Sequence, residues 1–396
     1  MKRFNTILLF SPVLLFLFLV CCECPGPTSS NNNVKGTFAI TNGFLIDGSG
    51  SDPIPNSIVI IQDGLIQSVG TSSTLDIPSG VEIIDLQGSY ILPGLMNTHV
   101  HSGYVENNLN SWANSGVTTV RDIGNLSSSP AAGFSARNIL LTDNKNARLV
   151  AAGPLVTTVG GYGNYPVTSP GDAEQKTNGL IDAGADLIKI AIEDNLQGRT
   201  WPMLSMDEIE MICQTAHNRN KRVAAHISRS SHLDMAIRGG VDDVDHMVID
   251  NLPDSLITSM IEKNMYWVPT LELWKGVSEL YGLHWITIPQ NNLLRFVQAG
   301  GKVALGTDYD GYVTPFDLGM PITEMKLMQE AGMTPMQILV SATRHSSYVC
   351  GMENELGTIE ESKIADIIIV KDNPLEDLEA LLNVQMVIHN GEVIKD

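Results

Sequence analysis

The chain has 396 residues, of which 43% are hydrophobic and 17% are charged, and its formal net charge is −20. This length and apolar content suffice for one large domain with a smaller companion, and they exclude a disordered or fibrous protein. Because no block of lysine and arginine is present to follow a phosphate backbone, nucleic acid is not an expected partner.

The N-terminal segment, residues 1–24, has the pattern of an export leader. Lys2 and Arg3 precede an apolar run from residue 7 to residue 20, and cysteines follow at positions 21, 22 and 24. A lipidated cysteine and an uncleaved anchor both stay open, since the run is slightly shorter than the ~20 residues of a spanning helix. We therefore expect an exported, extracytoplasmic protein that is attached to a membrane as a lipoprotein or by a signal anchor, with residues 25–36 as a polar linker.

Residues 37–92 hold short β-branched runs such as SIVIIQ and VEIIDL, separated by glycine and Asp-Gly turns. This pattern predicts a small β-sheet module. Strand-like runs return after residue 350, in IADIIIVKDNP and VQMVIHNG. The simplest arrangement pairs segments 37–92 and 351–396 into one discontinuous β-sandwich domain, and two unrelated caps are the alternative.

Between these segments, residues 93–350 alternate short apolar runs with longer amphipathic stretches, which is typical of repeated βα units. Candidate strands lie near residues 95–99, 117–121, 148–152, 187–191, 222–226, 243–246, 265–270 and 302–307. Two further helices are expected to start near Pro321 and Thr334. We predict an α/β fold, a TIM (β/α)8 barrel, with its active site at the carboxyl ends of the strands.

Side chains of the kind that bind metals stand at the ends of these strands. His99 and His101 lie two residues apart at the end of the first strand, a spacing that directs both side chains to one face. His226 ends the fifth strand, His246 the sixth, and Asp308 follows the eighth. Because the strand ends of a barrel meet at one mouth, these residues together predict a metal site.

Lys189 ends the fourth strand in the run LIKI, where apolar neighbours are expected to lower the pKa of its amine. A neutral amine can take up carbon dioxide and form a carbamate, an anion able to bridge two divalent ions. The four neutral imidazoles cannot supply that negative charge. The alternative is a structural lysine at a strand end.

With these residues the chain resembles the amidohydrolase superfamily, most closely its imidazolonepropionase-like and prolidase-like members, a subgroup that includes Xaa-Arg dipeptidases and ochratoxinase. The resemblance runs from about residue 37 to residue 396 and includes PGLMNTHVH, GVTTVRD, GADLIKI, LGTD and AGMTPMQILVSAT. It implies two divalent metal ions, with zinc favoured, and these ligands: His99, His101 and Asp308 for one ion, His226 and His246 for the other, and carboxylated Lys189 as the bridge.

The resemblance implies a hydrolase that cleaves an amide, peptide or cyclic amide bond of a small-molecule substrate. A hydroxide bridging the metal ions would attack the carbonyl, and Asp308 would take its proton and pass one to the leaving nitrogen. Three alternatives stay open: a mononuclear, imidazolonepropionase-like cyclic-amide hydrolase, a deaminase, and a non-catalytic exported binding protein. The stretch ISRSSH after His226 lacks the Glu usual in deaminases, and retention of every ligand position argues against the binding protein.

The loops after the strands are expected to determine the substrate. Four of them are the predicted pocket walls: residues 154–170, 193–204, 271–290 and 309–320. Their large aromatic residues favour an apolar or aromatic substrate group; they are Trp201, Trp274, Trp285, Tyr309 and Tyr312. Tyr162 and Arg229 are candidate substrate-binding residues, Arg229 for a carboxylate. A homo-oligomer stays open.

Two positions near the ligands are less typical. Asn97 stands where the family usually has Asp, so we expect a neutral hydrogen bond from Asn97 to a ligand histidine. His232, six residues after His226, is expected on the following loop or first helical turn, and no role at the site is predicted for it.

Overall fold

The computed structural model describes residues 36–124, 129–196 and 198–396. The leader predicted over residues 1–24 lies outside the described residues, as does the linker apart from Gly36, so export and membrane attachment stay predictions. None of the helices that the structure describes is long and apolar enough to cross a membrane.

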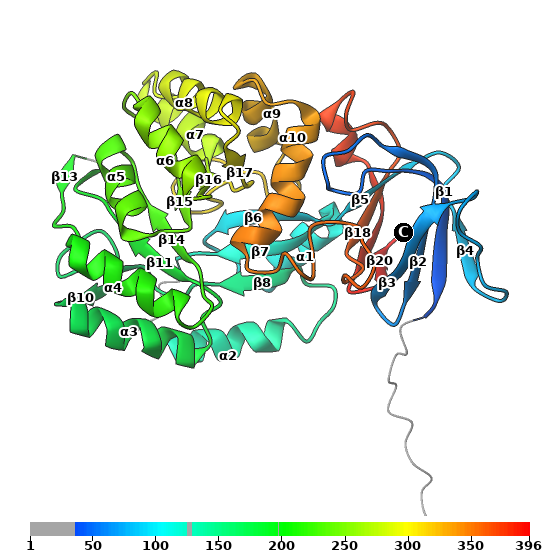
Figure 1. Ribbon diagram of the computed structural model, residues 1–396, viewed down its shortest axis with the longest axis horizontal. Helices are drawn as coiled ribbons and strands as arrows, with labels where there is room; N and C mark the ends of the chain where they lie inside the picture. Colours follow the sequence, from blue (N-terminus) through cyan, green and yellow to red (C-terminus); the bar gives the residue numbers. More distant parts are fainter. Residues whose placement is uncertain (1–35, 125–128, 197) are drawn as a thin grey trace, which may run out of the picture. The chain divides into compact units, whose positions relative to one another are not determined.

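The centre of the fold is a barrel of parallel strands, drawn from cyan to yellow in Figure 1. The strands are β6 (Leu95–Val100), β7 (Val117–Asp122), β8 (Arg148–Ala151), β11 (Ile188–Ala191), β14 (Val223–His226), β15 (Asp243–Asp245), β16 (Tyr266–Val268) and β17 (Lys302–Val303). Backbone hydrogen bonds close the ring: Asp186 donates to Ala151 over 2.9 Å, and Thr98 donates to Leu305 over 2.8 Å. The predicted TIM barrel is therefore confirmed.

Helices follow the strands and cover the outside of the barrel (Figure 1). They are α1 (Glu106–Ser115), α2 (Pro130–Leu140), α3 (Pro170–Ala183), α4 (Met206–His217), α5 (Ser230–Gly239), α6 (Asp254–Glu262), α7 (Leu271–Tyr281) and α8 (Thr287–Gln298). Helix α4 shows why they form here. Ser205 and Glu208 make a capping box at its start, and its apolar face, with Ile209 and Ile212, is buried.

The two helices expected after the barrel are α9 (Ile322–Glu330) and α10 (Pro335–Val340), and α10 continues through a π-helical turn (Ser341–His345) into α11 (Ser346–Val349). Small strands that the sequence did not predict lie in two loops at the carboxyl ends of the barrel strands. After β8 the chain forms β9 (Val156–Thr158) and β10 (Tyr165–Val167), and after β11 a hairpin of β12 (Asn195–Leu196) and β13 (Arg199–Thr200). These loops are therefore ordered by backbone pairing.

The two ends of the described chain form a second, eight-stranded sheet, blue and red in Figure 1. Its strands are β1 (Phe38–Leu45), β2 (Ile54–Gln62), β3 (Leu65–Thr71), β4 (Glu82–Asp85), β5 (Tyr90–Pro93), β18 (Ile367–Val370), β19 (Val384–His389) and β20 (Glu392–Lys395), with a 3₁₀ turn at Leu378–Leu382. Strand β5 joins the halves, because it pairs with β1 on one side and with β18 on the other. The predicted discontinuous domain is confirmed, and its strands belong to one hydrogen-bonded sheet.

Helix α7 receives its cap from a distant part of the chain. Its N-cap residue, Thr270, has a left-handed backbone (φ 49°) and makes no side-chain cap. Instead, the two carboxyl oxygens of Glu324 accept from the backbone N–H groups of Leu271 (3.0 Å) and Glu272 (2.7 Å). One carboxyl oxygen of Glu272 accepts from the backbone of Asp317 at 2.7 Å, and the other has no partner among the described residues. Burial raises the pKa of both carboxyls to about 8.

Replacing Glu272 with glutamine tests this burial through the pH dependence of stability. Because burial raises the pKa of Glu272 from 4.5 to about 8, the folded protein keeps a proton that the unfolded chain releases in that window. The free energy of unfolding contributed by this group therefore falls as the pH rises from 4.5 to 8, and the loss is complete above that range. Glutamine cannot ionise and keeps an oxygen for Asp317. We expect the free energy of unfolding of Glu272→Gln, relative to that of the wild type, to rise by about 2–5 kcal/mol between the low-pH and the high-pH end of this window.

Urea unfolding of both proteins at several pH values between about 5 and 8 measures the difference, in which the contributions of all other groups cancel. Glu279→Gln, an exposed position on the same helix, is the matched control and should run parallel to the wild type. Parallel curves for Glu272→Gln as well would contradict the raised pKa.

Candidate metal centre

The structure brings the predicted ligands together at the carboxyl ends of the barrel strands. His99 and His101 come from the end of β6, His226 is the last residue of β14, His246 follows β15, and Asp308 lies beyond β17. The ring centres of His99 and His246 are 4.6 Å apart, as are those of His226 and His246, and His99 and His101 are 5.3 Å apart. All five side chains therefore share one mouth.

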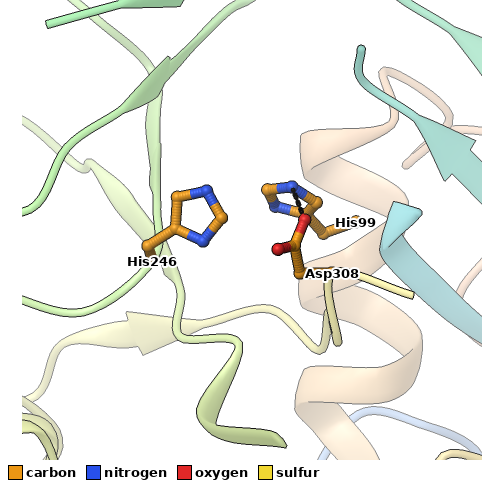
Figure 2. Close-up of side chains that lie close together, drawn as sticks. All are labelled: His99, His246 and Asp308. Carbon is orange, nitrogen blue, oxygen red and sulfur yellow. Dashed lines mark ion pairs between the residues drawn. The ribbon is translucent and has the colours of Figure 1, made fainter. Parts of the chain in front are cut away.

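Asp308 lies at the point where the histidines converge. Its Oδ1 is 3.0 Å from Nε2 of His99 and 2.8 Å from Nε2 of His101. Figure 2 shows His246 facing Asp308 and His99 from the other side. Burial alone would raise the pKa of Asp308, but His99 and His101 outweigh it and hold the pKa well below its ordinary value. Nitrogen and oxygen atoms of His99, His246 and Asp308 all lie within 4.8 Å of one another. Such a cluster can surround one cation.

The backbone turns sharply where two of these side chains enter the mouth. His246 (φ 71°) and Asp308 (φ 66°) both have left-handed backbones, which is uncommon for residues other than glycine. Strain of this kind persists only when the surroundings hold it in place. Here the turn directs each side chain from its strand toward the shared centre.

Three of the histidines have a ring nitrogen close to an oxygen of a neighbouring side chain. Nδ1 of His99 lies 3.2 Å from Asp245, Nδ1 of His246 lies 2.9 Å from the hydroxyl of Thr270, and Nε2 of His226 lies 3.4 Å from Glu193. Metal-binding histidines usually donate their second N–H to such a carboxylate or hydroxyl, which sets the tautomer and the ring orientation. Imidazole nitrogens and a carboxylate oxygen are also the ligands that zinc prefers. The residues therefore fit a divalent metal site.

Lys189 reaches the same centre from β11. Its side chain is buried, and its amine contacts Asp245. Burial lowers the pKa of Lys189 despite the opposing charge of Asp245. The expected environment of this lysine is thus present. The ion pair with Asp245 was not expected from the sequence.

A buried arginine lies beneath the ligands. Arg121, from β7, binds both carboxyl oxygens of Asp243 at 2.8 and 3.1 Å and lies 3.4 Å from Asp245. Its Nε donates to the backbone oxygen of Thr98, the residue before His99, at 2.6 Å. Sequence reasoning missed Arg121, Asp243 and Asp245. A signal for them was available in the sequence: all three are charged residues within strands predicted to be buried, where a charge is costly unless it is paired.

Asn97 makes the predicted neutral hydrogen bond to a ligand histidine, but it does so through the backbone N–H of His99, at 3.3 Å, and not through the ring. Its amide nitrogen donates to the hydroxyl of Thr307 at 2.9 Å, and its oxygen accepts from the backbone N–H groups of Thr307 and His99. Asn97 thus ties the first strand to the eighth. The charged contact to the His99 ring comes from Asp245, so neutral Asn97 does not remove it.

A second acidic group supports His226 from the loop after β11. Glu193 accepts from the backbone of Asn195 at 2.9 Å and lies 3.9 Å from His232, which in turn lies 3.1 Å from Asp194. Burial raises the pKa of Glu193, but hydrogen bonds from His226 and other donors outweigh it and lower the pKa to about 2. Glu193 was not predicted. His232 lies in the first turn of α5, as expected, but its contact with Glu193 was not predicted.

The cavity above these residues has a volume of about 1270 Å³, and both predicted substrate-binding residues line it. The ring of Tyr162 lies 4.6 Å from that of His226, and burial raises the pKa of its phenol to about 12. Arg229 is half-buried, and among the described residues its guanidinium has no ion-pair or hydrogen-bond partner. Tyr162 thus presents a neutral hydrogen-bond donor to the cavity, and Arg229 presents a cation that is unpaired among the described residues.

Most of the predicted aromatic residues also line the cavity, namely Trp201, Trp274, Trp285 and Tyr312. Tyr309 does not. Its ring packs edge-on against Trp112 at 5.1 Å and near Phe316 at 6.2 Å, so it fills space beneath the loop. The prediction that Tyr309 lines the pocket is therefore wrong, because its ring packs on Trp112 and Phe316 instead.

Comparison with known proteins places these observations among relatives. Residues 90–394 match the model of the amidohydrolase family. Ochratoxinase from Aspergillus niger is 23% identical over an alignment that covers 93% of this chain and 90% of that protein. Imidazolonepropionase from Brevibacillus brevis is 23% identical, with 86% of this chain and 90% of that protein covered. A solved Xaa-Pro dipeptidase with methionine bound in its active site is similar with a TM-score of 0.80 and 25% identity, covering 91% of this chain and all of that one (100%).

Glu193→Gln tests the support of His226. Because the substitution removes the negative charge that faces Nε2 of His226, we expect zinc affinity at the weaker-binding position to fall about 10-fold to 100-fold. Chelator competition measures this affinity, and Glu174→Gln, an exposed position on α3, serves as the control. Unchanged zinc affinity in Glu193→Gln would show that this contact does not hold a ligand.

Proposed function

The chain belongs to the amidohydrolase family, and on this premise we propose that it hydrolyses a carbon–nitrogen amide, peptide or cyclic amide bond with the help of two divalent ions, zinc first. The observation that carries the proposal is the convergence of four histidines, Asp308 and Lys189 at one buried mouth beneath a large cavity. The relatives named ochratoxinase, imidazolonepropionase and Xaa-Pro dipeptidase support the bond class.

The residues divide into two sets of ligands. His99, His101 and Asp308 would hold one ion, and His226 and His246 the other. When bound, such ions polarise a carbonyl oxygen and make water acidic enough to be deprotonated near neutral pH. The histidines hold no negative charge, so an anionic bridge is needed between two dications, and Lys189 as a carbamate would supply it.

Lys189 suits this role because it is buried at the centre with a lowered pKa. Asp245 does not depend on the lysine for neutralisation, since it also contacts Arg121 and the His99 ring. The second candidate is a site with one ion, in which Lys189 stays a cation paired with Asp245. The direct contact between these two side chains and the compact cluster of His99, His246 and Asp308 favour that alternative.

Three side chains perform the remaining steps. Asp308 accepts a proton from the attacking water and returns one to the leaving nitrogen, as a general base and then a general acid. The phenol of Tyr162, protonated at any working pH, donates a hydrogen bond to the carbonyl oxygen as negative charge develops there. Arg229 binds a substrate carboxylate.

Asp308→Asn tests the proton transfer. Because an amide cannot accept the proton of water, we expect kcat to fall about 100-fold to 10,000-fold with the fold intact. Steady-state kinetics on any amide that the wild type cleaves gives the measurement. Asp182→Asn, an exposed position on α3, is the matched control. A variant that keeps more than half of the wild-type kcat would contradict the role of Asp308.

The number of ions separates the two candidates. We expect protein purified with zinc and bicarbonate to bind two ions per chain and to carry the mass of one added carbon dioxide in native mass spectrometry. Lys189→Ala should lose that mass, one ion, and hydrolysis of N-acyl amino acids and dipeptides, whereas Lys263→Ala, at an exposed helix end, should not. One ion per chain with full activity in Lys189→Ala would establish the mononuclear alternative.

A further inference from the structure

The segment that follows Asp308, residues 309–320, packs directly against this candidate ligand. The backbone N–H of Gly311 donates to the backbone oxygen of Asp308 at 2.8 Å. Gly311 also lies so close to the Asp308 carboxyl that a Cβ could not be added without displacing it. A shift of this segment therefore moves the carboxyl to which proton transfer is assigned.

Helix α7 holds the same segment at two buried points. Gly276 packs so closely on the segment that an added Cβ would lie 2.6 Å from Thr314. One turn nearer the start of the helix, a carboxyl oxygen of Glu272 accepts from the backbone N–H of Asp317 at 2.7 Å. Thr314 and Glu272 are both buried, so these contacts are shielded from water. The position of the segment thus depends on that of α7.

The start of α7 is in turn tied to the opposite side of the candidate metal centre. The hydroxyl of Thr270 lies 2.9 Å from Nδ1 of His246, and Glu324 caps the two backbone N–H groups that follow Thr270. Helix α7 and the segment after Asp308 therefore form one continuous connection between the two ligands. We call residues 270–281 and 309–320 the α7 brace.

Acidic groups gather at one place in the α7 brace, around Glu272. Asp317 from the segment and Glu324 from α9 face it, and Lys275, on its own helix, pairs with exposed Glu279 at 2.8 Å. Both oxygens of Glu324 have N–H donors, whereas one oxygen of Glu272 has no partner among the described residues. A buried carboxylate that lacks a donor is costly, so Glu272 is the group that best keeps a proton. Burial, aided by the charge of Asp317, raises its pKa to about 8.

We propose that Glu272, in its protonated form, is a positioning residue that keeps the α7 brace closed and so holds Asp308 in place relative to His246. Loss of the proton in alkaline solution places a buried charge beside Asp317 and Glu324 and opens the contact with the segment to water. Proton transfer by Asp308 then fails, whereas substrate binding is little changed. The inference rests on the proposed function for this role of Asp308.

The first test follows kcat of the zinc-loaded enzyme from about pH 6 to about pH 9.5. We expect kcat of the wild type to fall at least about tenfold with an apparent pKa of about 8, while KM changes less than about twofold. Glu272→Gln keeps an oxygen for the backbone of Asp317 and cannot ionise, so its kcat should stay level. Asp317→Asn removes the charge that raises the pKa of Glu272, so its decline should begin at lower pH. Glu262→Gln, exposed at the end of α6, should follow the wild type.

Hydrogen exchange of residues 309–320 gives a readout that needs no substrate. At about pH 9 this segment should exchange at least about tenfold faster in the wild type than in Glu272→Gln, and at about pH 7 the two should agree. Residues 188–191, in β11, are the internal reference and should not differ. This result without hydrolysis of any amide would reject the proposed function and keep the α7 brace. Equal exchange at both pH values, or an alkaline decline of kcat that Glu272→Gln retains, would overturn the inference.

Discussion

The buried guanidinium of Arg121 connects two strands of the barrel to the backbone beside the candidate metal ligands. Arg121 crosses from β7 to β15, where it pairs with Asp243, and its Nε holds the backbone beside His99. Because every partner is buried, removing one of them leaves an uncompensated charge, which costs about 3–5 kcal/mol. Asp245, next to Asp243, then orients the His99 ring and contacts Lys189. The positions of the ligands thus depend on an ion network below them.

Fixed side-chain contacts also connect the candidate ligands to the cavity, through the start of α7. Thr270 ends the loop before α7 and contacts the His246 ring, and the next two residues are capped by Glu324. Helix α7, which lines the cavity with Leu273, Trp274, Val277 and Tyr281, therefore begins beside the candidate metal ligand His246. In TIM barrels, loops change substrates on a constant scaffold. Here the segment from Thr270 to Glu272 is fixed at two points, because Thr270 contacts the His246 ring and Glu324 binds the backbone of the two residues that follow.

Much of this arrangement could be predicted from the amino-acid sequence. The eight strands follow from short apolar runs between amphipathic stretches, and the barrel brings their ends together, so His99, His101, His226, His246 and Asp308 had to meet. Lys189 could be added because an ionisable group in an apolar strand is unusual. The discontinuous sheet followed from strand-like runs at both ends.

The order of the amino acids is enough to establish which strands form and which side chains stand at their ends, because periodicity and turn residues act over a few neighbouring positions. The partners of those side chains, by contrast, are set by the folded chain. Asp245 rather than Asn97 contacts the His99 ring, at a separation of 146 residues, and Glu324 caps a helix 53 residues away. Such choices depend on packing and desolvation across the whole barrel, which no local pattern records. Tyr309 was misplaced for the same reason: its burial against Trp112 is a property of the folded loop.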